Sequence, residues 1–122
     1  MSNTTSLSTV GEQLVALCRA GSYGEAIDTL YADDVVTVEP CDERLEGIEA
    51  VRTKNKWWVE NFGLHQSDVR GPYPHDDRFA VVFNAEVTHR SSNERNSLDE
   101  VGVYTVKDSK IVRAEFFYST AG

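Results

Sequence analysis

The fold is decided by the stretch Val103-Tyr104-Thr105-Val106-Lys107-Asp108-Ser109-Lys110-Ile111-Val112, in which a polar turn separates two apolar runs. These runs belong to strands predicted over residues 96–106 and 111–119, and another strand is predicted over residues 79–88. Long strands joined by tight turns form a meander, which must bend because strands twist. The C-terminal half is therefore expected to be a curved antiparallel sheet.

Helix signals come before this sheet. Thr9 and Glu12 have the spacing of a capping box, and Gly47 precedes an apolar helical stripe. Three helices are predicted, over residues 9–20, 22–31 and 48–62. Two short strands are predicted, over residues 35–39 and 66–70. The order predicts a single α+β domain over residues 1–122, with the N-terminal helices on the concave face of the sheet and residues 1–6 as a disordered tail.

The composition is that of an ordinary globular protein, with 40% hydrophobic and 26% charged residues. The formal net charge of −8 repels phosphate backbones and anionic lipid, which argues against nucleic acid and membrane surfaces as partners. No apolar run approaches the ~20 residues of a membrane helix. Cys18 and Cys41 alone do not support a disulfide framework, so we expect a cytoplasmic protein.

Three stretches of the sequence resemble one superfamily. Residues 30–40, Leu-Tyr-Ala-Asp-Asp-Val-Val-Thr-Val-Glu-Pro, and residues 47–52, Gly-Ile-Glu-Ala-Val-Arg, look like segments of ketosteroid isomerases. Residues 103–112, followed by Glu-Phe-Phe-Tyr at 115–118, look like the closing hairpin of SnoaL-like proteins. The chain thus resembles the SnoaL-like branch of the nuclear transport factor 2-like, or ketosteroid isomerase-like, superfamily.

This resemblance implies a cone-shaped barrel, open at one end, with a pocket between the helices and a mixed, mostly antiparallel sheet. It also implies a homodimer built by packing sheets, and Val82, Tyr104 and Phe117 are candidates for that outer face. The superfamily contains isomerases, polyketide cyclases, dehydratases, hydrolases, transport factors and pocket proteins. The resemblance therefore indicates a fold without selecting one function.

Glu39 lies directly before Pro40, where ketosteroid isomerases carry the carboxylate that moves a proton between carbons of the substrate. The resemblance implies that Glu39 is a partly desolvated general base. The family segment has one more acidic residue at this place, so an exposed glutamate at the end of a strand remains the alternative.

Ketosteroid isomerases also stabilise the dienolate oxygen, with a tyrosine of the first helix and a carboxylic acid on a later strand. The first predicted helix contains no tyrosine. An ungapped comparison from Ile111 places the strand acid at Val101, next to Glu100, and Asp99 shares the alternation of Val101. Asp99 is therefore the candidate for the carboxylic acid. The group that stabilises the dienolate oxygen is incomplete, because the tyrosine is missing.

SnoaL-like cyclases use a histidine and an aspartate to start an aldol closure. His65 follows the third predicted helix and is the candidate for a pocket mouth, although a surface histidine is the alternative. No spacing of Cys and His suggests a metal. The sequence predicts neither a metal nor a cofactor.

An aromatic pocket is predicted from the alternation of apolar residues. Trp58 follows the inward stripe of the third helix, and Trp57 is expected to point elsewhere because adjacent helical residues lie about 100° apart. Plain core packing is the alternative for the aromatic rings. The predicted lining consists of Tyr31, Trp58, Phe83, Val101, Val103, Ala114, Phe116 and Tyr118.

The leading hypothesis is a small-molecule pocket protein that transfers a proton on an apolar or carbonyl-containing ligand, as an isomerase, cyclase or dehydratase. A non-catalytic module for ligand binding or dimerisation is the alternative. A third reading, a protein-binding partner like the nuclear transport factors, would require a flat recognition surface instead of a pocket.

Overall fold

The computed structural model describes residues 3–40 and 43–118. Their elements follow in the order α1 (Asn3–Arg19), α2 (Tyr23–Leu30), β1 (Tyr31–Glu39), β2 (Glu43–Glu46), α3 (Ile48–Asn61), β3 (Phe62–His75), β4 (Arg78–His89), β5 (Glu94–Lys107) and β6 (Lys110–Tyr118). Among these helices, none combines the length and the apolar character needed to cross a membrane.

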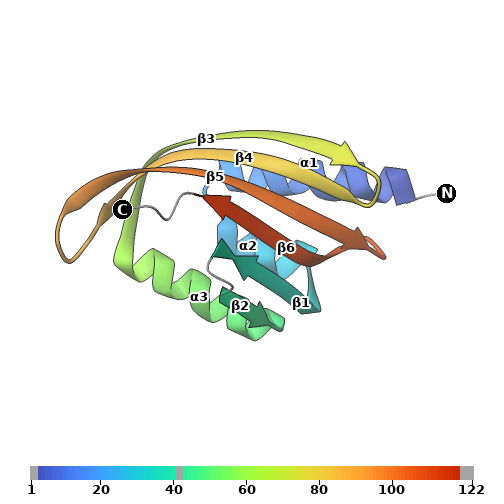
Figure 1. Ribbon diagram of the computed structural model, residues 1–122, viewed down its shortest axis with the longest axis horizontal. Coiled ribbons are helices and arrows are strands. Elements are labelled where there is room, and N and C mark those ends of the chain that lie inside the picture. Colours follow the sequence, from blue (N-terminus) through green and yellow to red (C-terminus); the bar gives the residue numbers. More distant parts are fainter. Residues whose placement is uncertain (1–2, 41–42, 119–122) are drawn as a thin grey trace.

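The six strands form one sheet in the order β2-β1-β6-β5-β4-β3. β1 runs parallel to β6, and all other neighbours are antiparallel. β2 and β3 are the edges, so the sheet is an open cone and not a closed barrel. Figure 1 shows β3, β4 and β5 arching over α1, with α2 and α3 beneath the rest of the sheet. The predicted α+β architecture of three helices on a curved, mixed sheet is confirmed.

The core lies between the helices and the concave face of the sheet. Leu14 of α1, Val35 of β1 and Val81 of β4 are fully buried, as are Ile111 and Ala114 of β6. Apolar residues alternate along β4, so that Phe79, Val81, Phe83 and Val87 all face the helices. Burial of this face by the three helices stabilises the curved sheet.

One irregularity sets the faces of the C-terminal hairpin. Val106 pairs with Ile111, whereas Thr105 pairs with Arg113, so β6 carries one extra residue at Val112. This bulge lets Ile111 and Ala114 both face inward, although they are three residues apart. From Ala114 onward, the inner face carries Phe116 and Tyr118, and the facing positions of β5 are Tyr104, Gly102 and Glu100.

Several predicted element bounds need correction. α1 begins at Asn3, so residues 3–6 are helical and not part of a tail, and Thr9 lies inside the helix. β1 begins at Tyr31, where the second helix was predicted to end, and β3 extends far beyond residues 66–70. β2 forms in a segment for which no strand was predicted, because it pairs with β1. Residues 1, 2 and 119, and Cys41, lie outside the described residues, while Cys18 is a buried free thiol.

The stacking of Phe79 on Tyr104 provides a test of the core. The ring centroids lie 5.2 Å apart, and Phe79 is 1% exposed. We expect Phe79→Ala to lower the free energy of unfolding by about 3–5 kcal/mol, because it removes buried contacts and leaves a cavity. Urea denaturation measures the loss. Tyr73→Ala is the control, since Tyr73 is 53% exposed and should cost less than about 1 kcal/mol. Equal losses in the two variants would contradict the described core.

Candidate functional site

A cavity of about 610 Å³ lies between the helices and the inner face of the sheet. Most of its lining is apolar, and a small set of polar side chains converges on it, as is usual for small-molecule sites. Glu39, Glu100 and Tyr118 belong to this set. The predicted lining residues that border the cavity are Tyr31, Trp58, Phe83, Phe116 and Tyr118.

Glu39 faces this cavity because of the alternation of β1. Val35 and Thr37 are buried on the inner face, and Glu39 continues their alternation. Its side chain is 19% exposed, so the alternative of a solvent-exposed strand end does not describe it. The Tyr118 hydroxyl donates a hydrogen bond to Glu39 Oε1 over 2.6 Å.

Lys54 of α3 lies on the other side of the Glu39 carboxylate. Its Nζ is 3.7 Å from Glu39 Oε2 and 3.1 Å from Glu43 Oε1. A single ammonium group is thus shared by carboxylates at the end of β1 and the start of β2. Together, Tyr118 and Lys54 give Glu39 a hydroxyl donor on one oxygen and a cation near the other.

Glu100 is the second carboxyl group of the cavity. It lies directly opposite Tyr118 across the β5–β6 pair, on the inner face. Burial raises the pKa of Glu100 from 4.5 to about 7, and the negative charge of Glu39 adds to this rise. Near neutral pH, a large fraction of Glu100 therefore retains its proton and can donate a hydrogen bond.

Tyrosine hydroxyls supply further donors to the same space. Burial raises the pKa of Tyr23 to about 12, and it also holds the pKa values of Tyr31 and Tyr104 well above their ordinary range. Burial is likewise the main cause of the raised pKa of Tyr118, and the hydrogen bond to Glu39 adds to it. All four side chains border the cavity and remain neutral phenols. The arrangement thus offers one carboxylate base, one carboxylic acid and several neutral donors.

Asp99, Val101 and Val103 were predicted on this inner face, and the structure places them on the opposite face. Asp99 accepts a hydrogen bond of 2.6 Å from Asn84 Nδ2, and Val101 is paired with Phe117, which is exposed. A hairpin without a bulge would set Val103 and Val101 opposite the inward Ala114 and Phe116. The extra residue at Val112 sets Tyr104 and Gly102 there instead, and a shift of one residue exchanges the two faces of a strand. The prediction for Tyr104 was also wrong. Tyr104 was a candidate for the outer face, and the structure buries it on the inner face.

His65 and Ala114 also differ from their predicted places. His65 is exposed on β3 and contacts the Thr88 hydroxyl of β4, so it does not border the cavity. Ala114 faces inward but is buried beneath the cavity wall, beside Tyr104. Within the described residues, no group of three or more His, Cys, Asp or Glu side chains is arranged to hold a metal ion.

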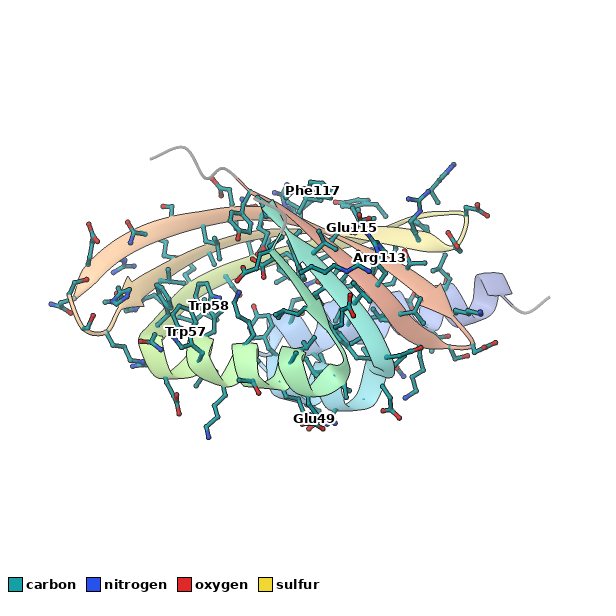
Figure 2. All side chains as sticks on the ribbon, turned by 60° about the horizontal axis from the view of Figure 1, so that its bottom comes forward. Glu49, Trp57, Trp58, Arg113, Glu115 and Phe117 are labelled. Carbon is teal, nitrogen blue, oxygen red and sulfur yellow. The ribbon has the colours of Figure 1, made fainter. Side chains whose placement is uncertain are left out.

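Two functional candidates emerge only from the structure. Glu100 shares the alternation of Gly102 and Tyr104, so a strand pattern that allowed a bulge would have found it. Lys54 lies four residues before Trp58, on the side of α3 that borders the cavity. Trp57 borders the cavity as well as Trp58, contrary to the prediction, because the cavity opens at this end of α3. Figure 2 shows both rings at this end of α3, toward the overlying strands.

Comparison with known proteins agrees with this geometry. A profile of the SnoaL-like domain matches residues 5–118. The chain belongs to the SnoaL-like domain family. Curated proteins give no match to this SnoaL-like chain.

Solved structures share the fold of this SnoaL-like protein. One from Mesorhizobium loti, described as a proposed SnoaL-like polyketide cyclase and also as a carbohydrate phosphatase, is 36% identical, with a TM-score of 0.86 over 91% of this chain and 97% of that chain. A proposed SnoaL-like polyketide cyclase from Jannaschia is 15% identical, with a TM-score of 0.78 over 91% of this chain and 86% of that one. A protein of ketosteroid isomerase-like fold from Catenulispora acidiphila is 15% identical, with a TM-score of 0.71 over 86% and 82% of the two chains. The last two show the fold alone.

The coupling between the two carboxyl groups is open to a direct test. We expect Glu39→Gln to lower the pKa of Glu100 from about 7, because the variant removes the negative charge that opposes ionisation of Glu100. The pKa should stay above 4.5, since burial is the larger cause. Carboxyl carbon NMR of labelled glutamate measures it, with Glu100→Gln identifying the signal. Glu86→Gln on the outer face should leave it unchanged, and an unchanged value in Glu39→Gln would contradict the coupling.

Proposed function

We propose that this SnoaL-like protein catalyses proton transfer at the carbon next to a carbonyl group of an apolar ligand, with Glu39 as base and Glu100 as acid. The observation that carries the proposal is the pair of inward carboxyl groups that border one cavity. Tyr118 donates to Glu39 over 2.6 Å and lies opposite Glu100 on the neighbouring strand. The environment raises the pKa of Glu100 to about 7, which suits Glu100 to the role of acid and leaves Glu39 as the candidate base.

In the first step, the Glu39 carboxylate accepts a proton from the carbon beside the carbonyl. The electron pair of that C–H bond moves into the carbonyl group and leaves an enolate oxygen. The Glu100 carboxylic acid donates a hydrogen bond or its proton to this oxygen, where negative charge develops in the transition state. The apolar walls exclude water, which strengthens both interactions.

In the second step, the fate of the enolate depends on the ligand. Return of the proton from Glu39 to a different carbon gives isomerisation. Attack of the enolate carbon on a second carbonyl of the same ligand gives cyclisation, in which Glu39 returns its proton to the new alkoxide oxygen. Loss of a β-hydroxyl group gives dehydration, in which the same proton leaves with the hydroxyl group as water. The Mesorhizobium loti relative is described as a proposed polyketide cyclase, and this supports cyclisation as one outcome at the same acid–base pair.

A non-catalytic ligand-binding role is the second candidate. The mostly apolar cavity of about 610 Å³ favours it, because a site of this size and character buries a small molecule without any reaction. In that case, Glu39 and Glu100 would only orient the carbonyl group of the ligand.

The proposal also includes a homodimer that packs through the outer sheet face in the cytoplasm. Figure 2 shows Arg113, Glu115 and Phe117 on the side of the sheet away from the helices. Phe117 is 55% exposed, and its cross-strand partner Val101 provides apolar surface next to it. Such a patch supports a self-complementary contact.

Deuterium exchange at carbon tests the proton transfer without knowledge of the natural substrate. We expect the protein in D₂O to accelerate deuterium incorporation beside the carbonyl of 4-phenyl-2-butanone, followed by NMR. Glu39→Gln should slow this by at least about 100-fold, and Glu100→Gln by roughly 100-fold. The rate should fall as pH rises through about 7, because Glu100 then loses its proton.

Glu60→Gln is the matched control, since Glu60 is exposed on the same helix as Lys54 and does not border the cavity. The Glu60→Gln variant should catalyse deuterium incorporation into the ketone at the wild-type rate. If wild-type protein gives no exchange, or if Glu39→Gln and Glu60→Gln exchange equally fast, the catalytic proposal is wrong. Ketone binding without exchange would support the non-catalytic role.

A further inference from the structure

The rim of the cavity carries an unusual share of the exposed apolar surface. Five large apolar side chains are exposed among the described residues, and three of them, Trp57, Val59 and Leu64, border the cavity. They are 47%, 61% and 45% exposed. Apolar surface left open at the entrance of a pocket marks a place where a ligand completes the burial.

Aromatic rings at this rim contact one another in a chain. The centroid of Phe62 lies 4.1 Å from that of Trp58, 4.8 Å from that of His89 and 5.9 Å from that of Trp57. Trp57 and Trp58 meet edge to face, with centroids 6.4 Å apart. Trp57 is thus the more exposed tryptophan of a packed aromatic cluster, and its orientation is set by the rings beneath it.

Hydrogen bonds hold this end of α3 against the β4–β5 turn. Arg90 donates from its backbone N–H to the Asn61 carbonyl over 2.8 Å and from Nε to the Val59 carbonyl over 3.2 Å. Asn61 Nδ2 donates to the Trp57 carbonyl over 2.8 Å. The backbone that carries Trp57 is therefore fixed before any ligand arrives, which lowers the entropic cost of binding.

The chemistry of the rim differs from that of the interior. Glu39, Glu100 and Tyr118 lie on the strands β1, β5 and β6, whereas the rim side chains are apolar or aromatic apart from Arg90. Ring-to-ring contacts stabilise more than the burial of an equal apolar area, so the rim favours rings over alkyl chains. At about 30 Å³ for each water-sized group, the cavity of about 610 Å³ holds roughly 20 non-hydrogen atoms.

We propose that the rim is a ring-binding subsite and that Trp57 determines its specificity: the ligand carries a carbonyl group at the carboxyl pair and an aromatic ring at Trp57. This inference rests on the proposed function, because the carboxyl pair orients the other end of the ligand. It adds to that function a preference between ligands of equal size.

Two ketones of ten carbons each test whether the subsite prefers a ring to an alkyl chain. 4-Phenyl-2-butanone carries a phenyl ring at its far end, and 2-decanone carries a linear chain. Isothermal titration calorimetry of both ketones compares wild-type protein with Trp57→Leu, which keeps an apolar side chain and a good helix former but removes the ring. We expect Trp57→Leu to weaken binding of the phenyl ketone by about 2- to 12-fold and binding of 2-decanone by less than about 2-fold.

Two further variants make the result specific to the ring. Trp57→Phe retains an aromatic ring and should recover most of the affinity for the phenyl ketone. Lys56→Ala, at the exposed neighbouring position outside the cavity lining, should bind both ketones like the wild type. Thermal unfolding midpoints of the three variants identify any loss caused by misfolding.

The outcomes distinguish this inference from the proposed function. Equal losses for both ketones in Trp57→Leu, or no loss for the phenyl ketone, would overturn the ring-binding subsite, while exchange that depends on Glu39 would leave the proposed function standing. If neither ketone binds the wild-type protein, both proposals are wrong.

Discussion

The placement of Tyr118 beside Glu39 and opposite Glu100 depends on a single bulge in β6. Because Val112 is an extra residue in the β5–β6 pairing, Tyr118 and Glu100 face the helices together with Ala114 and Tyr104. If β6 paired with β5 without this bulge, Tyr118 would face away from the helices, whereas Glu100 would stay inward because it pairs with Phe83 of β4. The bulge therefore brings the Tyr118 hydroxyl into a cavity that the alternation of β1 and β5 already supplies with Glu39 and Glu100.

The helices determine the surroundings of the carboxyl groups on the inner face of the sheet. They cover the inner face, and their apolar side chains remove water from around Glu100, so burial becomes the main cause of its raised pKa. α3 contributes Lys54, whose ammonium lies 3.7 Å from Glu39 and keeps a compensating charge beside the carboxylate. The same helix ends at the aromatic rim, so one element connects the charged interior with the entrance.

Local patterns in the sequence predict much of this structure. The resemblance implies a general base at Glu39, and the regular alternation of Val35, Thr37 and Glu39 puts that side chain on the inner face of β1. The inward faces of Phe116 and Tyr118 follow in the same way. β5 could not be placed by counting, because a bulge depends on pairing between strands and has no local signature at Val112. β2 was missed for a similar reason, since its charged residues become a strand only through contact with β1.

The central claim is that Glu100 is a partly buried carboxylic acid beside the Glu39 carboxylate, and the pH dependence of stability tests it most directly. The pKa of Glu100 is raised in the folded state, so Glu100 favours folding below its unfolded value of 4.5, and this contribution is lost as pH rises through about 7. The free energy of unfolding should therefore fall over this window in the wild type relative to Glu100→Gln, which cannot ionise. Curves that stay parallel from about pH 4.5 to 7 would contradict the account.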